Sequence, residues 1–183
     1  MKKLILATAV LCAGCGVEPI TEEEAVGVLT ALTQLADEAG LSREGDTESV
    51  SCPSGGSATV ELLREVEDLE GDTIRAEADW SIRPAACAVT SAGTPFTVDG
   101  DPDLQVQAKG WGVSFDDFRL EYRMNGGFTW DRDSEGGSSC EVSLVSEGAV
   151  LTEDPVDGTD SVDGTLTGLL CGLDVTIDLR RLF

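Results

Sequence analysis

Histidine is absent from the 183-residue chain. Its imidazole is the side chain most often used as a general base and as a metal ligand, so its absence excludes Ser-His and Cys-His nucleophile arrangements. The sequence also lacks a phosphate-binding loop, a dinucleotide-binding fingerprint and a Gly-x-Ser-x-Gly elbow. Paired carboxylates are the acid–base groups that remain. We therefore expect a protein that is not an enzyme, with a histidine-free carboxylate enzyme as the alternative.

Basic residues are scarce. Lysine and arginine together number 12, against 35 aspartates and glutamates, and the net charge is −23 at pH 7. A surface this acidic repels nucleic acid and anionic lipid headgroups. We expect no nucleic-acid partner and no peripheral membrane contact made by the folded domain. Keeping a protein soluble is the ordinary use of such a charge balance.

Long apolar runs are missing as well. The N-terminal run from Leu4 to Leu11 is far shorter than the about 20 residues that a membrane-spanning helix needs. Two lysines precede this run, and the small-residue stretch Cys12-Ala13-Gly14 follows it, just before Cys15. This three-part layout is typical of an export signal that is removed from the mature protein.

The tetrad Cys12-Ala13-Gly14-Cys15 resembles the lipobox of bacterial lipoproteins, with Cys12 at a position where leucine is usual. The resemblance implies that residues 1–14 are removed and that Cys15 receives a diacylglyceryl group on its sulfur. Further acylation, by palmitate or a similar chain, would give stable membrane anchoring. Residue 16 is Gly and not the Asp of inner-membrane retention signals, which favours the outer membrane. The membrane is thus the expected partner, contacted through the lipid.

Removal of residues 1–14 leaves 169 residues, enough for one ordinary domain. We assign residues 15–20 to a short lipidated tether and residues 21–183 to a single domain. Lys2 and Lys3 leave with the signal, so the net charge changes from −23 to −25.

A helix is predicted over residues 21–39. Thr21 and Glu24 have the spacing of a capping box, and Gly40 is a typical helix stop. Apolar residues with helical spacing give the segment one face to bury: Ala25, Val28, Leu29, Leu32, Leu35 and Ala36. Residues 40–57 are rich in Ser, Gly, Asp and Glu, which predicts a loop.

Residues 58–183 alternate between apolar and polar side chains, as strands do. The fold class that follows is mainly β: an antiparallel meander curled into a barrel or a sandwich, with one N-terminal amphipathic helix packed on it. The change of parity at Asp116-Asp117 indicates a bulge or bend. Asn125-Gly126-Gly127 is predicted to be a hairpin turn that pairs Met124 with Phe128.

Four cysteines remain after Cys15, and four cysteines allow three disulfide connectivities. A hairpin centred near residues 70–71 brings Cys52 within about two residues of Cys87. A later hairpin, with its loop over residues 153–160, brings Cys140 opposite Cys171. We therefore predict the pairs Cys52–Cys87 and Cys140–Cys171, with free thiols or a crossed pairing as the alternative.

One segment has part of the spacing of a calcium-binding loop. Asp131, Asp133 and Glu135 alternate and are followed by Gly136, but the position of the usual bidentate acid is occupied by Val142. A solvated hairpin loop is the alternative. Weak calcium binding at these three acids is the one metal site predicted, and no other cofactor is expected.

The domain itself is predicted to be a non-enzymatic binding or structural module of a lipid-anchored envelope protein. One alternative is a carrier of a small apolar ligand in a β-barrel cavity. Its lining would come from aromatic residues that otherwise form an ordinary core: Trp80, Trp111, Phe115, Tyr122, Phe128 and Trp130. Whether the sheet is hollow or filled by side chains distinguishes the two.

Overall fold

The protein is described by a computed structural model that covers residues 18–70, 73–100, 102–113, 118–132, 136–146, 149–153 and 160–182. One helix, α1 (Glu22–Ala39), precedes the strands, and a short 3-10 helix, η2 (Leu179–Arg181), follows them. The strands are β1 (Thr47–Ser51), β2 (Ser57–Glu70), β3 (Thr73–Ala85), β4 (Cys87–Ser91), β5 (Thr94–Asp99), β6 (Leu104–Gly112), β7 (Arg119–Asp131), β8 (Gly137–Val145), β9 (Ala149–Glu153), β10 (Asp160–Asp163), β11 (Thr165–Leu170) and β12 (Leu173–Asp178).

Helix α1 forms where the sequence predicts it. The Thr21 hydroxyl accepts a hydrogen bond from the Glu24 backbone N–H at 3.3 Å, and the Glu24 carboxylate accepts one from the Thr21 N–H at 2.9 Å. Both halves of the capping box are therefore present. Gly40 ends the helix in the left-handed conformation, at φ 57°.

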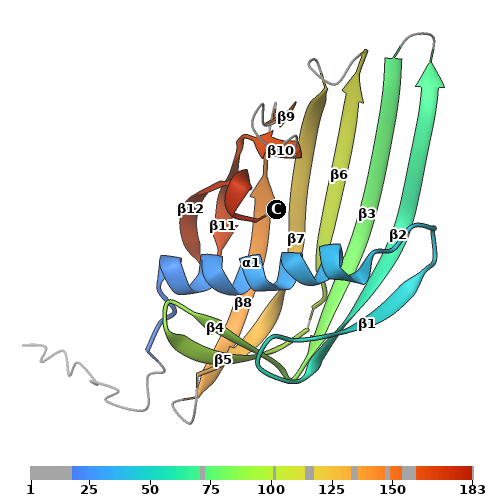
Figure 1. Cartoon of the computed structure of the whole chain (residues 1–183). Helices are drawn as coiled ribbons and strands as arrows, with labels where there is room; N and C mark the ends of the chain where they lie inside the picture. The colour runs from blue at the N-terminus through green and yellow to red at the C-terminus, as the bar shows by residue number, and fades with distance from the viewer. Residues whose placement is uncertain are drawn as a thin grey trace, which may run out of the picture.

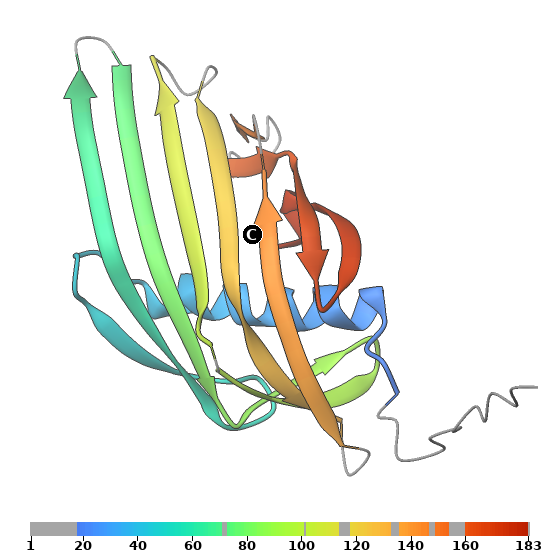
Figure 2. The same cartoon turned by 180° about the vertical axis from the view of Figure 1, so that it is seen from behind.

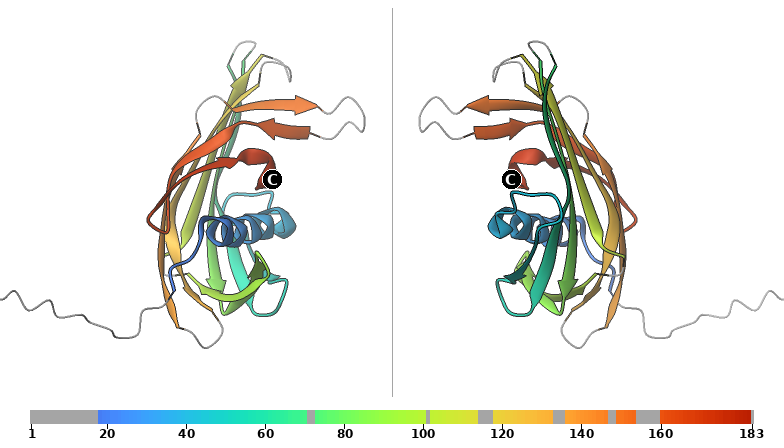
Figure 3. Two further views of the ribbon diagram at one scale, coloured as in Figure 1. Left: turned by 90° about the vertical axis from the view of Figure 1, so that its left-hand side faces the viewer. Right: turned by 90° about the vertical axis from the view of Figure 1, so that its right-hand side faces the viewer.

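All twelve strands belong to one antiparallel sheet, in which eight follow the path β1-β2-β3-β6-β7-β8-β11-β12. The other four branch from β7 as two pairs, β5 with β4 and β9 with β10. The sheet is strongly curved, and α1 lies across its concave side (Figures 1 and 2). We call this concave side the inner face. The edge-on views place the helix and the hairpin of β9 and β10 on the same side of the sheet (Figure 3).

The predicted closure into a barrel or a sandwich is wrong. In the described part of the chain, the sheet is not closed, because β1 and β12 end the path and do not pair with each other. The inner face is covered instead by α1, which buries an apolar stripe against the strands. One helix packed on a curved sheet removes the apolar surface from water without closure.

The core lies between α1 and the inner face. Its largest fully buried side chains come from both: Leu29, Leu32, Leu35, Leu62, Ile82, Phe96, Leu104, Met124, Phe128, Leu144, Leu166 and Leu170. Phe128 and Met124 are among them, so both side chains belong to the packed core. The C-terminus joins this core, since the Thr33 hydroxyl donates to the Leu182 carbonyl at 3.2 Å.

Asn125-Gly126-Gly127 is not a hairpin turn. The three residues lie inside β7 and pair with Ser143, Val142 and Glu141 of β8. Gly126 has φ 107°, and a Cβ there would come within 2.0 Å of the Asp103 carbonyl oxygen. The glycines thus let one long strand bend, and β7 pairs with β6 before the bend and with β5 after it.

One other segment differs from expectation, and one further prediction falls outside the described residues. The predicted loop over residues 40–57 contains β1, which pairs antiparallel with β2. The parity change assigned to a bulge at Asp116-Asp117 falls in the connection between β6 and β7, which run antiparallel, so the alternation restarts on a new strand. Asp116 and Asp117 themselves lie outside the described residues.

The two disulfides of the structure join Cys52 to Cys87 and Cys140 to Cys171, with Cα atoms 5.5 Å and 4.1 Å apart. The pairing is the predicted one, but the contact that brings Cys52 to Cys87 is not the predicted hairpin alignment. It lies in the turn between β1 and β2, and this turn lies along β4, where the Ala88 N–H donates to the Gly55 carbonyl at 2.7 Å. Disulfides persist in oxidising compartments, which indicates an extracytoplasmic location.

Replacing Cys52 and Cys87 together with alanine is expected to lower the free energy of unfolding by about 3 to 4 kcal/mol. The bridge spans 35 residues, and without it the unfolded chain regains the entropy of that loop. Urea denaturation of the oxidised proteins measures the difference. Non-reducing peptide mapping tests the pairing itself, and a fragment that links Cys52 to Cys140 would contradict it.

Candidate ligand groove on the inner face

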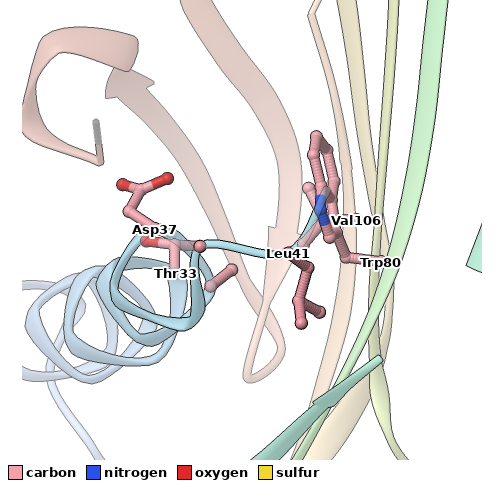
Figure 4. A pocket seen from close by; sticks show the side chains of 7 residues that line it. Thr33, Asp37, Leu41, Trp80 and Val106 are labelled. Carbon is pink, nitrogen blue, oxygen red and sulfur yellow. The ribbon is translucent and has the colours of Figure 1, made fainter. Parts of the chain in front are cut away.

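A groove opens between the C-terminal half of α1 and the inner face of the sheet. Its cavity volume is about 230 Å³, and it is lined by Thr33, Ala36, Asp37, Gly40, Leu41, Trp80 and Val106. Figure 4 shows Asp37 and Thr33 on the helix side and the Trp80 ring beside Val106 on the sheet side. The volume exceeds the about 150 Å³ that admits benzene and falls below the about 300 Å³ of drug-sized pockets.

The sheet side of the groove follows from strand register. Trp80 of β3 pairs with Val106 of β6, so both side chains point to the inner face. The helix side depends on the cap at Gly40, because the chain turns there and places Leu41 against the core beside the sheet. Three apolar side chains from separate elements, Leu41, Trp80 and Val106, thus meet at one place.

Beyond α1, strands β2, β3, β6 and β7 extend past the part of the sheet that the helix covers (Figure 1). Their inner-face positions next to the groove are small. Ala78 pairs with Ala108, and Ala76 pairs with Gly110. A Cβ at Gly110 would come within 2.4 Å of the Phe118 ring, so only glycine admits that ring. The floor of the groove therefore continues as an apolar surface of small residues, which we call the strip: Ala76, Ala78, Ala108 and Gly110.

A β-bulge decides which side chains of β2 border this strip. The register between β2 and β3 shifts between Leu62 and Arg64, so Leu62 and Glu65 both face inward. Glu65 pairs with Ala78 and Glu67 pairs with Ala76, which places both carboxylates on the inner face at the edge of the strip. Both glutamates are exposed.

The basic residues of the same four strands lie on the opposite face. Alternation and register place all of them on the outer face: Arg64, Arg75, Arg83, Lys109, Arg119 and Arg123. There they meet acidic neighbours, as when the Glu77 carboxylate contacts Arg64 at 3.0 Å and Lys109 at 3.7 Å. The inner positions of these strands, in the described residues, carry no basic side chain.

Two ionisable groups of the groove region have shifted pKa values. Partial burial raises the pKa of Asp37 above its ordinary value, although this residue stays exposed at the rim. Burial, with the nearby charge of Asp37, raises the pKa of Tyr122 to about 12. Tyr122 is therefore neutral near pH 7, and Asp37 is the one acidic or basic residue among the described lining residues.

A second polar cluster lies at the other end of α1. The Arg132 guanidinium, 11% exposed, donates to the Glu24 carboxylate at 2.8 Å and lies 5.4 Å and 5.6 Å from the ring centres of Phe96 and Trp130. Burial alone would raise the pKa of Glu24. Hydrogen bonds from Thr21 and Thr94, together with the charge of Arg132, outweigh burial and lower it. The cluster holds the start of α1 against the end of β7, and its role is structural.

The sequence-predicted site residues are only partly described. Cys15, Asp133 and Glu135 lie outside the described residues, and Asp131 is exposed at the end of β7. Within the ranges that the structure covers, no three His, Cys, Asp or Glu side chains gather as a metal site would require. Calcium binding at Asp131, Asp133 and Glu135 therefore stays a prediction.

The aromatic residues named as a cavity lining are dispersed. Trp80 lines the groove, and Tyr122 is buried on the inner face close to it. Trp130 belongs to the Arg132 cluster, whereas Trp111 is 37% exposed on the outer face. Phe115 lies outside the described residues. Sequence reasoning missed Asp37 and Leu41, whose only signal is their position beside the predicted helix stop at Gly40.

In the described ranges, no helix combines the length and the apolar character needed to cross a membrane. Comparison of the chain with protein-family models, with curated proteins and with solved structures finds no match.

Proposed function

We propose that this protein is a lipid-anchored, exported binding protein that holds a small apolar molecule, or the apolar part of a larger one, in the groove between α1 and the inner face. The observation that carries the proposal is the open groove in which the apolar side chains of Leu41, Trp80 and Val106 meet. Concave, mostly apolar sites with few polar groups are typical of small-molecule binding.

The cellular setting is inferred from the disulfides and from the N-terminal segment. The disulfides support an exported protein. The lipobox-like tetrad ending at Cys15 supports an N-terminal lipid, and Gly16 supports the outer membrane as the destination. The folded domain would then begin at Thr21, directly after the short tether of residues 15–20. Binding without catalysis is proposed because the described lining offers one ionisable group, Asp37, and the chain has no histidine.

The proposal is tested by dye binding to the parent protein and to a variant whose groove is filled by a larger side chain. The full chain with Cys15→Ser, which carries no competing acyl chain, is titrated with the uncharged dye N-phenyl-1-naphthylamine, whose emission rises in apolar surroundings. We expect saturable binding, and we expect Ala36→Phe to weaken it by tenfold or more because the ring occupies the space beside Trp80.

Gln34→Phe is the matched control, since Gln34 lies on the same helix but is exposed to solvent. This variant is expected to bind the dye as the parent protein does. Circular dichroism and thermal melts establish that all three proteins are folded. Equal binding by the parent and the Ala36→Phe variant would show that the groove is not the site, and absence of saturable binding would refute the proposed function.

A further inference from the structure

We infer that the groove and the strip beyond it select apolar ligands that carry a positive charge, such as a long-chain amine, over ligands with a carboxylate. The inference rests on the proposed function and names its class of ligand. It comes from the distribution of charge between the two faces of the sheet, which the binding of an apolar chain alone does not require.

Among the described residues, the side chains that line the groove and the strand positions that border the strip carry charge of one sign only. Asp37 lies at the rim of the groove, and Glu65 and Glu67 border the strip of Ala76, Ala78, Ala108 and Gly110. The basic side chains of β2, β3, β6 and β7 all point to the outer face. An apolar chain that extends from the groove onto the strip would therefore meet a carboxylate at the rim of the groove and two along the β2 border of the strip.

The bulge at Leu63 determines which charge borders the strip on the β2 side. Strict alternation from Leu62 would put Arg64 on the inner face, opposite Ala78, and a basic residue would then border the strip. The bulged register puts Glu65 there instead and sends Arg64 to the outer face, where it contacts Glu77. One extra residue in β2 thus changes the sign of the charge at this border.

The carboxylates beside the strip determine which head group of a ligand is favoured. An ammonium group beside exposed carboxylates gains a modest attraction, and a carboxylate in the same place is repelled by a similar amount. Together these effects predict a preference of about tenfold for the amine over the acid of equal chain length, decreasing as salt screens the charges. An uncharged alcohol of that length should bind with intermediate affinity.

The experiment uses the full chain with Cys15→Ser and measures displacement of N-phenyl-1-naphthylamine by decylamine, decanol and decanoate at pH 7.5. Asp37→Asn, Glu65→Gln and Glu67→Gln are combined in one inner-face variant. Glu61→Gln, Asp68→Asn and Glu121→Gln, which register places on the outer face, form the matched variant with the same change in net charge. It controls for attraction of the amine to the acidic protein as a whole.

We expect the parent and the outer-face variant to prefer decylamine over decanoate by about tenfold at low salt, and the inner-face variant to lose most of this preference while it still binds decanol. If decanol binds but the parent shows no preference for the amine, or if both variants lose it equally, the inference is overturned and the proposed function stands. If none of the three displaces the bound dye, the inference is also overturned, whereas the proposed function is decided by the dye titration of the parent and the Ala36→Phe variant.

Discussion

Replacing Arg132 with methionine is expected to lower the free energy of unfolding by about 3 to 5 kcal/mol, because it leaves the Glu24 carboxylate buried without its cation. Arg132 and Glu24 have side chains 11% and 10% exposed, and their contact is 2.8 Å long. Methionine keeps an apolar stem against Phe96 and Trp130, so the loss reports mainly on the charge. Chemical denaturation of the parent and the variant measures it.

Two controls separate a buried ion pair from a general effect of losing an arginine. Arg83→Met removes a pair with Asp103 at 2.8 Å in which the Arg83 side chain is 63% exposed, and we expect it to lower stability far less than Arg132→Met does, because solvent screens the pair. Adding Glu24→Gln to Arg132→Met is expected to restore part of the stability, since no lone charge is then buried. Equal losses from Arg132→Met and Arg83→Met would contradict the structural role of this cluster.

The same cluster predicts a dependence of stability on pH. The folded state lowers the pKa of Glu24 below its ordinary value of 4.5, so this group stabilises the fold above about pH 4.5. The stabilisation is lost as pH falls from 4.5 through the lowered pKa. In Arg132→Met, one cause of the lowered pKa is removed, and the loss on acidification is expected to be smaller.

Replacing Cys15 with serine is expected to abolish acylation and to remove the protein from the membrane fraction. The prediction follows from the charged, apolar and small-residue layout before Cys15. Two or more acyl chains give stable anchoring, and the apolar run from Leu4 to Leu11 is too short to replace them. Metabolic labelling with an alkyne-tagged fatty acid, followed by fractionation of washed membranes, measures both effects.

Cys12→Ser is the matched control, since Cys12 lies three residues earlier in the same segment. That variant is expected to incorporate the fatty acid and to remain with the membrane. A Cys15→Ser protein that still carries the label, or that stays in washed membranes at full length, would show that the resemblance to a lipobox is misleading. The groove would then belong to an exported protein without a lipid anchor.

Local interactions explain which parts of the fold could be predicted. The capping box of Thr21 and Glu24 and the stop at Gly40 lie within a few residues of the backbone groups that they satisfy, so the helix was predictable to within one residue. Alternation along the strands identified the inner positions of Trp80 and Val106, because side chains of a strand point to opposite faces whatever its partners are.

Non-local interactions explain the errors. An Asn-Gly-Gly segment suits a tight turn and an extended bend equally well, since glycine adopts positive φ in both. Only the pairing of β7 with β5, β6 and β8 decides for the bend at Gly126. Closure of the sheet likewise depends on how much of the inner face one helix covers, which no segment of the sequence encodes alone.

By itself, the sequence determined the helix and the two faces of most strands, because capping and alternation act over short distances along the chain. It also predicted the partners of four cysteines, but the contact that brings Cys52 to Cys87 is made by the turn between β1 and β2 and is tertiary. The tertiary structure decided the open sheet and the groove. Asp37, Leu41, Trp80 and Val106 come from a helix end and two strands, and they lie together only because α1 crosses the curved sheet at that place. The bulge at Leu63 is decided in the same way, since a shift of register exists only relative to the neighbouring strand.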